Sequence, residues 1–501
     1  MTGRSHNAAV VAINPFLRHL LLDPAPARVS WRGTTLRTYT HTGHTTDVVV
    51  NPARAAAWLR RHGFSGLLAN WSQHLHGQRF VVEHTSVNPV HPLHLGSLRS
   101  SLLGSYLAAV LRSAGAAVTT HYFVNDHGRQ VRFLSWILDR ADRTRIPATI
   151  RFDHAAGVLY ALANMFHAHR AGDIARLHTN HPWLHDVVAL TPADHAALTR
   201  WLADEQPPDS VLVRRMLDAA LGDLATVGTT IDVIEHESTL HPAPSLPYDL
   251  IRHGPAATVN GTLCLRHRAG LIPLTRPDGT WLYFTRDVLN TRRQSRHAPH
   301  VFHVIGHDQD LLQRGLRGLF RHATVEHVSF GTVTGGGRRF SARQNRLMTV
   351  ADLYQTDRGH SLWRCALAML TRHRRTPIDV RTSPVTHDLN ALIRAHAAAA
   401  AGTGIDRHAD CAHEAVWPLL MALLRAPEVM HRSLTTRSPH PVMRFAVHTS
   451  RLYLRAARHG HIPPWLPEVF VEALAFMTEL PAIPLTDLAQ HADQPRTEEA
   501  V

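Results

Sequence analysis

The sequence contains no lysine, so every fixed positive charge on a side chain is an arginine guanidinium. A guanidinium is planar and presents several N–H donors as a fork, which favours two-pronged contacts with phosphate or carboxylate. A base-composition bias in the genome explains the missing lysine equally well. The absence therefore sets the kind of positive charge available without assigning a ligand.

Cysteine is scarce as well, with Cys264, Cys365 and Cys411 far apart in the chain. An odd number at these spacings excludes a disulfide framework and a CxxC metal site, and it suits a reducing cytosol. No apolar run reaches the roughly 20 residues that a membrane span needs, because polar residues interrupt even the early stretch AAVVAINPFLRHLLL. We expect a cytoplasmic protein with no membrane segment.

The chain has 501 residues, which is enough for about three domains of ordinary size. Its formal net charge is +14 with histidine neutral, and 44% of its residues are hydrophobic. A globular protein with this excess of positive charge favours a polyanion as partner, and nucleic acid fits better than a membrane surface.

Three domains are expected along the chain. Residues 1–75 predict a small α+β lobe, with a strand pair in VSWRGTTLRTYTH and a helix over residues 52–62. Residues 76–355 predict an α/β domain built on a Rossmann-type parallel sheet, with a mostly helical insertion at about 136–245. Residues 356–501, where strands are expected to stop, predict an all-α bundle with helices in 413–430, 441–460 and 466–480.

The α/β domain opens with a βαβ unit. RFVVEHTS and AAVTTHYFVND are typical of strands, and SLRSSLLGSYLAAVLRSAG between them is typical of a helix with one broad apolar face. Sheet character returns at TLCLRH. TWLYFTRDVLN and HVFHVIGHDQDLLQRGLRGLF each predict a strand that turns into a helix through polar residues.

Polar side chains gather at these strand-to-helix turns, where open parallel sheets place their ligands. The candidates are Glu83, Asn88, Tyr283, Asp287 and Gln309. Two carboxylates on one rim can accept from a cationic ligand, with bidentate geometry available for a guanidinium. The alternative is local: Asp287 pairs with Arg286 or caps its own helix.

The turn PLHLGS lies between a strand and a helix, so backbone N–H groups and the positive helix end face the loop. His94 can donate to a phosphate oxygen, and Gly96 leaves room for a flat ring. In a chain with 41 histidines a chance match is equally reasonable, and Ser97 could be an ordinary N-cap. A later basic loop, GGGRRFSARQNR, can close over phosphates or can be a solvated turn.

Taken in order, these segments resemble the arginyl-tRNA synthetases, which are class I enzymes with a Rossmann catalytic domain and a helical anticodon-binding domain. VVEHTSVNPVHPLHLGSLR is similar to the family's HIGH region, and the block that ends in GGGRRFSARQNRLMTVADL is similar to its KMSKS-type loop. HYFVNDHGRQ, IDVIEHESTL, TWLYFTRDV and VIGHDQD match intermediate blocks. The resemblance spans most of residues 79–480.

The resemblance implies an arginine-tRNA ligase that uses ATP with Mg²⁺, acts on an arginine-specific tRNA and works as a monomer. It implies an arginine pocket at Glu83, Asn88, Tyr283, Asp287 and Gln309. It implies catalytic roles for His94, Arg339, Ser341 and Arg343, and ATP contacts for His91, His94, Gly96 and Ser97. No protein metal ligand is implied.

The chain departs from the family's pattern where phosphate is handled. Ser97 replaces the second histidine of HIGH, Arg339 replaces the first lysine of the loop, and Asn345 replaces the usual glycine after it. His91 stands where some members have a compensating lysine. These changes leave two alternatives open: a catalytically impaired tRNA-binding or arginine-sensing protein, and an enzyme that passes the arginyl group to a small molecule.

Overall fold

The computed structural model describes residues 35–39, 45–49, 51–203, 209–240, 256–267, 270–320, 322–356, 359–381 and 386–490. One apolar core runs through the central sheet, the helices beside it and the C-terminal bundle, and a smaller core lies under an outlying sheet. Among the described helices, none combines the length and the apolar character that a bilayer crossing requires.

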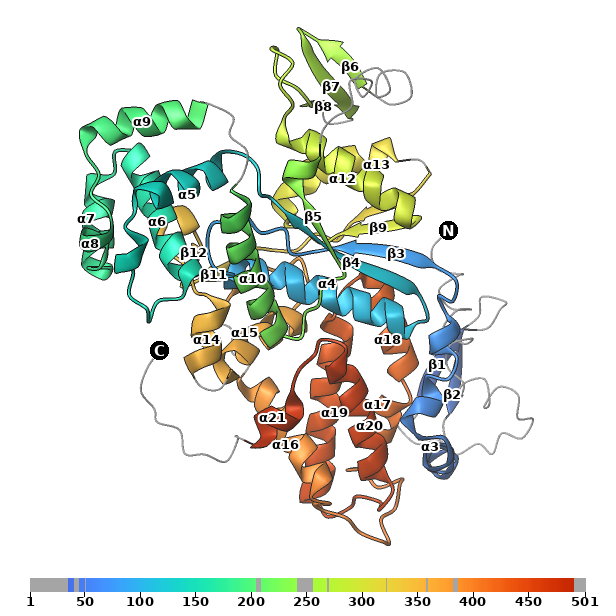
Figure 1. Ribbon diagram of the computed structural model, residues 1–501. Helices are drawn as coiled ribbons and strands as arrows, with labels where there is room; N and C mark the ends of the chain where they lie inside the picture. The colour runs from blue at the N-terminus through green and yellow to red at the C-terminus, as the bar shows by residue number, and fades with distance from the viewer. Residues whose placement is uncertain are drawn as a thin grey trace.

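A parallel sheet of five strands forms the centre of the molecule, in the order β10-β9-β3-β4-β5 (Figure 1). Its strands are β3 (Arg79–Glu83), β4 (Ala117–Val124), β5 (Val233–His236), β9 (His300–His303) and β10 (Thr324–His327). Phe80, Val81 and Val82 are almost fully buried, as expected for a parallel strand covered on both faces. The α/β prediction is confirmed.

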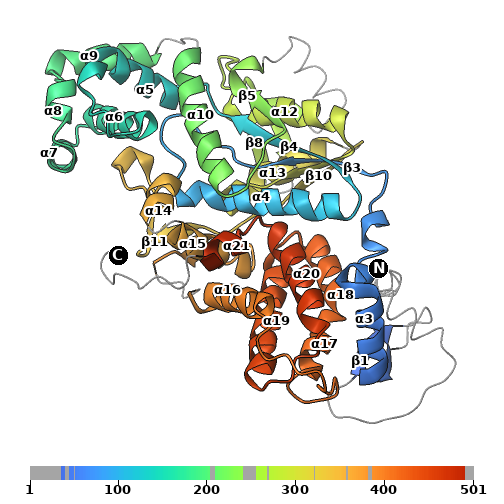
Figure 2. The same ribbon diagram turned by 60° about the horizontal axis from the view of Figure 1, so that its bottom comes forward.

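Helix α4 (Leu95–Ser113) joins β3 to β4 and confirms the predicted βαβ unit. Leu98, Leu102, Tyr106 and Val110 are all at most 2% exposed, because α4 lies between the sheet and the C-terminal bundle (Figure 2). Helix α4 is therefore covered by the sheet on one side and by the bundle on the other.

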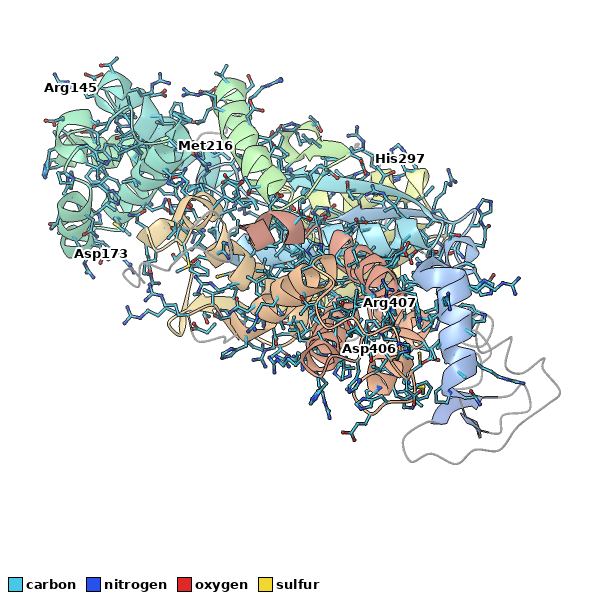
Figure 3. The ribbon with its side chains drawn as sticks, turned by 90° about the horizontal axis from the view of Figure 1, so that it is seen from below. Arg145, Asp173, Met216, His297, Asp406 and Arg407 are labelled. Atoms are coloured by element: carbon cyan, nitrogen blue, oxygen red, sulfur yellow. The ribbon has the colours of Figure 1, made fainter. Side chains whose placement is uncertain are left out.

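Helices between β4 and β5 form a separate lobe at one end of the molecule, and Figure 3 shows Arg145 and Asp173 at its outer side. They are α5 (Arg129–Arg140), α6 (Phe152–His167), α7 (Ala171–Asn180), α8 (Leu184–Val187), α9 (Pro192–Ala203) and α10 (Ser210–Thr226), with 3-10 turns η2 (Arg143–Arg145) and, after β5, η3 (Glu237–Thr239). The stretch 136–245 was predicted to be mostly helical, but it also contains β5, the edge strand of the central sheet.

The strand predicted at TLCLRH is confirmed as β7 (Thr262–His267), but it pairs antiparallel with β6 (Ala256–Val259) and β8 (Gly270–Pro273) in an outlying sheet and does not join the central one. A second prediction about the sheet is wrong. TWLYFTRDVLN has no sheet strand, because a tight turn at residues 276–280 brings Thr275 opposite Trp281 in an isolated bridge. Helix α12 (Tyr283–His297) then begins at once, followed after β9 by η4 (His307–Gln309) and α13 (Asp310–Leu319).

The prediction that strands stop at about residue 355 is wrong. β13 (Ile378–Asp379) pairs with β11 (Val333–Gly335), which also pairs with β12 (Arg338–Arg339). Because β13 is only two residues long, it has no periodicity to detect. The turn η5 (Ala342–Gln344) and helices α14 (Val350–Thr356) and α15 (His360–Thr371) complete this region.

The C-terminal bundle consists of α16 (Thr386–Ala400), α17 (Trp417–Leu423), α18 (Ala426–Thr436), α19 (His440–Arg458), α20 (Leu466–Glu479) and α21 (Leu485–Gln490). Figure 3 places Asp406 and Arg407, from the loop between α16 and α17, on this part of the molecule. The helix predicted over 413–430 is interrupted after Leu423, and α18 begins at Ala426 with Pro427 in its first turn, because proline suits the first turn of a helix but not its interior. The other two predicted helices are present.

The N-terminal strands are β1 (Thr35–Tyr39) and β2 (Thr45–Val49), an antiparallel pair. The prediction placed both strands within 29–41, but β2 lies later, and residues 29–34 lie outside the described residues. Helix α3 (Pro52–Leu67) continues past its predicted end through a kink at Gly63. Beyond the kink, Glu472 of α20 accepts hydrogen bonds from the amides of Phe64 and Ser65. The short 3-10 turn η1 (Trp71–Gln73) leads into β3.

Candidate active site

A cavity of about 170 Å³ opens at the carboxyl ends of β3, β4 and β9, beside α12. Four of the predicted ligand-binding residues, Glu83, Tyr283, Asp287 and Gln309, line it together. Its other lining residues are Ser86, Phe123, Asn125, Asn290, Thr291, His303, Ile305, Gly306, Asp308 and Gln313. The two predicted carboxylates therefore share one cavity, at the edge where the sheet topology places ligands.

A chain of buried hydrogen bonds holds Glu83, which is 8% exposed at the end of β3. Its Oε2 accepts from Asn290 Nδ2 at 2.6 Å and from Gln294 Nε2 at 2.5 Å. His303 then bridges Gln294 and Gln313, with both bonds at 3.0 Å. Since both bonds to Glu83 use Oε2, the second carboxylate oxygen remains for a ligand.

Asp287 is a carboxyl group placed among other carboxylates. Its pKa lies well above the ordinary value because of burial and because of the nearby charges of Glu83 and Glu237, although a hydrogen bond from Tyr283 acts in the opposite direction. Burial and the same carboxylates, Asp287 first, also raise the pKa of Tyr283. A cation placed among these groups would remove the repulsion that raises both values.

The local alternative for Asp287 is wrong. Arg286 forms its ion pair with Glu237, at 3.0 Å, and Asp287 lies in the second turn of α12, past the capping position. A carboxylate that is neither a cap nor the partner of its neighbouring arginine remains available to the cavity.

Asn88 does not line the cavity; it lies in the loop after β3, where its carbonyl accepts from Val90 N. Asn125, which the sequence reasoning missed, lines the cavity directly after β4. The rule that identified Glu83, a polar side chain just past an apolar strand, applies equally to FVND and could have found it.

His94 is the N-cap of α4. Its Nδ1 accepts from Gly96 N at 3.0 Å, so the neutral ring carries its proton on Nε2. Burial, together with His91, lowers the pKa of His94 to about 3, and the ring is therefore an uncharged donor at neutral pH. Ser97 is not the cap; its hydroxyl donates to His94 O at 3.0 Å.

Gly96 has a packing reason of its own. A Cβ there would lie 2.8 Å from the His94 ring and 3.3 Å from Phe340. The segment after the basic loop pairs with the same turn: Leu95 N donates to Met348 O and Val350 N to Leu93 O. The PLHLGS turn and the basic loop, some 250 residues apart in sequence, are thus joined by backbone hydrogen bonds.

The basic loop is a hairpin held by Asp379. This carboxylate accepts from Thr334 Oγ1 and from the amides of Gly336, Gly337 and Arg381. Although desolvation acts to raise it, the hydrogen bonds, that from Gly337 first, lower the pKa of Asp379 to about 2. The amides of Gly336 and Gly337 therefore already donate to a carboxylate of the protein and are not open to a phosphate.

The predicted loop residues take different positions. Arg339 is exposed on β12, and Ser341 pairs with Arg346 through both backbone bonds. Asn345 adopts the left-handed conformation, with φ of 48°, which asparagine tolerates better than most residues. Arg343 lines another pocket, on the helical lobe, and is not among the residues around Glu83.

Comparison with known proteins agrees with this geometry. A family model described as "tRNA synthetases class I (R), catalytic domain" matches residues 66–169. The arginine-tRNA ligase of Methanosarcina mazei is 27% identical over 287 residues, covering 55% of this chain and 47% of the relative. That of Aeropyrum pernix is 27% identical over 430 residues, covering 72% and 65%. The chain is therefore similar to arginine-tRNA ligases over more than half of its length, at low identity.

The chain spans about half the length of the curated relatives it matches. Among solved structures, it is similar to the Thermus thermophilus arginyl-tRNA synthetase, with a TM-score of 0.63, 18% identity, and coverage of 96% of this chain and 91% of that one. The Plasmodium falciparum enzyme gives a TM-score of 0.58 at 13% identity, covering 90% and 86%. At these identities the structures support the Rossmann-type fold.

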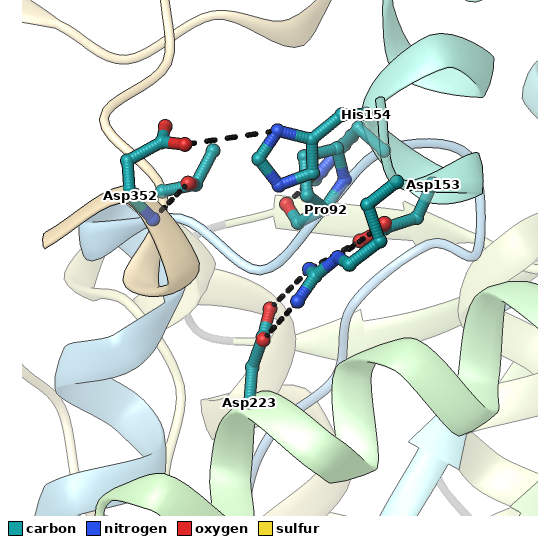
Figure 4. Close-up of polar contacts among 8 residues, drawn as sticks. Pro92, Asp153, His154, Asp223 and Asp352 are labelled. Carbon is teal, nitrogen blue, oxygen red and sulfur yellow. Dashed lines mark hydrogen bonds and ion pairs between the residues drawn. The ribbon is translucent and has the colours of Figure 1, made fainter. Parts of the chain in front are cut away.

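The helical lobe lies beside the HIGH-like turn, and Figure 4 shows the polar contacts of Asp153, His154 and Asp223 near Pro92. Arg151 is clamped between Asp153 and Asp223, with four bonds of 2.6–2.8 Å. The next helical turn packs on the loop, because a Cβ on Gly157 would lie 3.0 Å from Pro92. His91 donates through Nδ1 to Pro92 O at 2.9 Å, so its ring is fixed within the loop.

Proposed function

We propose that the protein activates arginine with ATP and transfers the arginyl group to tRNA. The observation that carries this proposal is the cavity that Glu83 and Asp287 line together, in which the charge of Glu83 helps to raise the pKa of Asp287. Such a site gains free energy from a planar cation that forms forked hydrogen bonds, and a guanidinium has that form. Similarity to arginine-tRNA ligases supports the same substrate.

In the first step the arginine carboxylate attacks the α-phosphorus of ATP. A C–O–P bond forms, the bond to the β-phosphate breaks, and pyrophosphate leaves. The attacking carboxylate is already ionised, so no general base is required, and the protein contributes position and charge stabilisation. We assign Nε2–H of His94 to a phosphate oxygen and Arg339 to the charge that develops on the leaving group, and we place adenine near Gly96.

In the second step a terminal ribose hydroxyl of tRNA attacks the arginyl carbonyl. The new ester bond forms, the bond to AMP breaks, and the hydroxyl proton leaves with AMP or water.

Ser97 affects the first step, because it lacks the N–H donor that the ring of a second histidine supplies. One such donor is worth roughly 3 kcal/mol, so we expect activation to be slower by about a hundredfold.

Mg²⁺ enters this proposal with ATP, held by the phosphates. The described residues include no group of three or more His, Cys, Asp or Glu side chains placed to hold a metal ion. A monomer working in the cytosol completes the proposal; none of its three cysteines forms a disulfide.

The test is arginine-dependent exchange of pyrophosphate into ATP, measured with and without tRNA, together with charging of tRNA. We expect slow exchange that requires arginine and tRNA. If neither exchange nor charging is detected over a protein-free blank, the protein is not a ligase.

The altered residues Ser97 and Arg339 favour one alternative, a non-catalytic protein that keeps the arginine cavity. The double substitution Ser97→His and Arg339→Lys separates the two. In a decayed enzyme it creates exchange where the native chain has none, whereas in a working specialised enzyme it changes the existing rate little.

A further inference from the structure

Arg99 is a charged side chain that the core of the protein encloses completely. It lies in α4, one helical turn after Leu95, and its exposed fraction is 0%. Burial lowers the pKa of Arg99 to about 10, so the guanidinium is still positive at neutral pH. Among the described residues, no carboxylate forms an ion pair with it. Because an unbalanced charge in the core costs free energy, the contacts of the guanidinium have to offset that cost.

Three backbone carbonyls accept hydrogen bonds from the Arg99 guanidinium. Nη1 donates to Gly331 O and to Thr376 O, both at 2.8 Å, and Nη2 donates to His373 O at 3.4 Å. Gly331 comes two residues before strand β11, and Thr376 comes two residues before strand β13. Figure 2 shows β11 and α15 beside α4. Arg99 therefore holds the start of both strands against the helix that begins at the HIGH-like turn.

The two segments that Arg99 contacts are also joined to each other. Gly331 N donates to Arg374 O at 2.9 Å. A Cβ on Gly331 would lie 2.6 Å from Arg375 O, which leaves no room for a side chain between the two backbones. The strands β11 and β13 that follow pair in parallel. The guanidinium therefore contacts one joined unit and not two independent strands.

This joined unit leads directly into the basic hairpin. β11 pairs antiparallel with β12, which carries Arg339, and Asp379 of β13 binds the glycine amides of the turn. On the other side of the hairpin, backbone hydrogen bonds join residues 348–350 to the PLHLGS turn. The hairpin is thus attached to the start of α4 twice, through the backbone where the chain leaves it and through Arg99 where the chain enters it.

We propose that Arg99 is a positioning residue that sets the place of the basic hairpin, and so of Arg339, relative to His94. Because Arg99 is fully buried, it acts through β11 and β13 and not by contact with a substrate. Its effect on catalysis rests on the proposed function, in which Arg339 and His94 both act on the phosphates of ATP. A misplacement of about 1 Å can cost on the order of a hundredfold in rate.

The test variants are Arg99→Gln, which removes the guanidinium, and the conservative Arg99→Lys. One ammonium can donate to both Gly331 O and Thr376 O, as the single Nη1 does. The matched control is Tyr106→Phe on the same helix, because the buried Tyr106 hydroxyl lies 2.6 Å from Ser433 Oγ of the C-terminal bundle. The control removes a buried contact of α4 that does not lead to the hairpin. Thermal melting measures the loss of stability in each variant.

Pyrophosphate exchange with tRNA present, over ranges of ATP and arginine concentration, gives the two KM values. We expect Arg99→Gln to raise the KM for ATP about tenfold, as for the loss of one charged hydrogen bond, and to leave the KM for arginine unchanged. Arg99→Lys should give a smaller rise, and it carries the test if Arg99→Gln melts below the assay temperature. A loss of folded protein lowers kcat alone, as we expect for Tyr106→Phe. An unchanged KM for ATP in the Arg99 variants, or an equal rise in the control, would overturn the proposal.

Amide hydrogen exchange, followed by mass spectrometry, tests the attachment without any activity. The amides of Gly336 and Gly337 should exchange faster in Arg99→Gln than in the native chain or in Tyr106→Phe, because the entry of the hairpin is released. Faster amide exchange in a protein whose native chain shows no pyrophosphate exchange removes the ligase and supports Arg99 as the residue that places the hairpin. Pyrophosphate exchange by the native chain, with equal amide exchange in all three proteins, removes this inference alone.

Discussion

The cavity around Glu83 and the pocket around Arg343 carry opposite charges and are built in opposite ways. In the cavity, Glu83 is buried and is held by Asn290 and Gln294, and Gln294 is in turn held by His303. In the pocket, the arginines are exposed, although Arg129 is hydrogen-bonded to His167.

This difference indicates two kinds of recognition. A buried carboxylate held by fixed amide side chains selects one small cation by geometry, because a wrong ligand leaves polar groups unpaired. Exposed guanidinium groups attract a polyanion through charge, and that attraction weakens as salt increases. The acidic cavity therefore favours one small cation, whereas the exposed arginines favour an anion.

The substitution Glu83→Gln should break the first half of this comparison and have the largest effect. It removes one partner of a buried charge pair with the arginine ligand, a loss of about 2–5 kcal/mol. We expect arginine-dependent exchange to fall by about 10²–10³-fold in kcat/KM, with tRNA binding unchanged.

The matched control is Glu235→Gln, which removes a buried carboxylate from β5 that pairs with Arg293 at 2.8 Å and does not line the cavity. Steady-state exchange over a range of arginine concentrations gives both constants. A loss of tRNA binding in Glu83→Gln, or equal losses of exchange in the two variants, would contradict the separation of the two sites.

A smaller effect should follow from Gln294→Leu, which leaves Glu83 charged but removes the amide that orients it. Gln294 is a positioning residue in this account. We expect the KM for arginine to rise about tenfold with kcat little changed, and the free energy of unfolding to fall by about 1–3 kcal/mol, because His303 loses a buried partner.

The comparison for that variant is Gln313→Leu, which removes only the far bond of His303. The effect of Gln313→Leu on the KM for arginine should be smaller, because Gln313 lies further from Glu83 along the chain of hydrogen bonds. Exchange kinetics and chemical denaturation of both variants test this order, and a larger KM effect in Gln313→Leu would show that the network does not act through Glu83.

Much of the cavity could be predicted from the sequence. The buried run before Glu83 defines β3, and the rule that parallel strands end at one edge brings Glu83 and Gln309 together. Asp287 was placed in the cavity for a reason that was partly wrong, because it lies on α12 and not at the end of a strand. For Asp287, its place in the cavity was thus more predictable than the helix that carries it.

The phosphate side could not be predicted in the same way. His94 accepts a hydrogen bond from Gly96, Asp379 occupies the glycine amides of the hairpin, and Arg343 faces the helical lobe. The latter two placements depend on contacts between segments that are far apart in the chain, and β13 is too short to leave a pattern. Local periodicity contains no information about such contacts.

The smallest expected effect is a pH dependence at Asp287. Because its pKa is raised in the folded protein, the folded state keeps a proton that the unfolded chain releases near pH 4. The stability from this carboxyl is therefore complete below pH 4 and is lost as the pH rises through the raised pKa. Relative to Asp287→Asn, the native chain should lose about 1–3 °C in Tm between pH 5 and pH 8.

Arginine sharpens this last test, because a bound cation stabilises the ionised carboxylate. In saturating arginine the difference between the native chain and Asp287→Asn should shrink or reverse as the pH rises. The same trend should weaken in Glu83→Gln, because Glu83 is one of the charges that raise the pKa of Asp287. A difference in Tm that does not vary with pH, with or without arginine, would mean that Asp287 does not titrate beside the ligand, and the acidic cavity would then owe its selectivity to Glu83 alone.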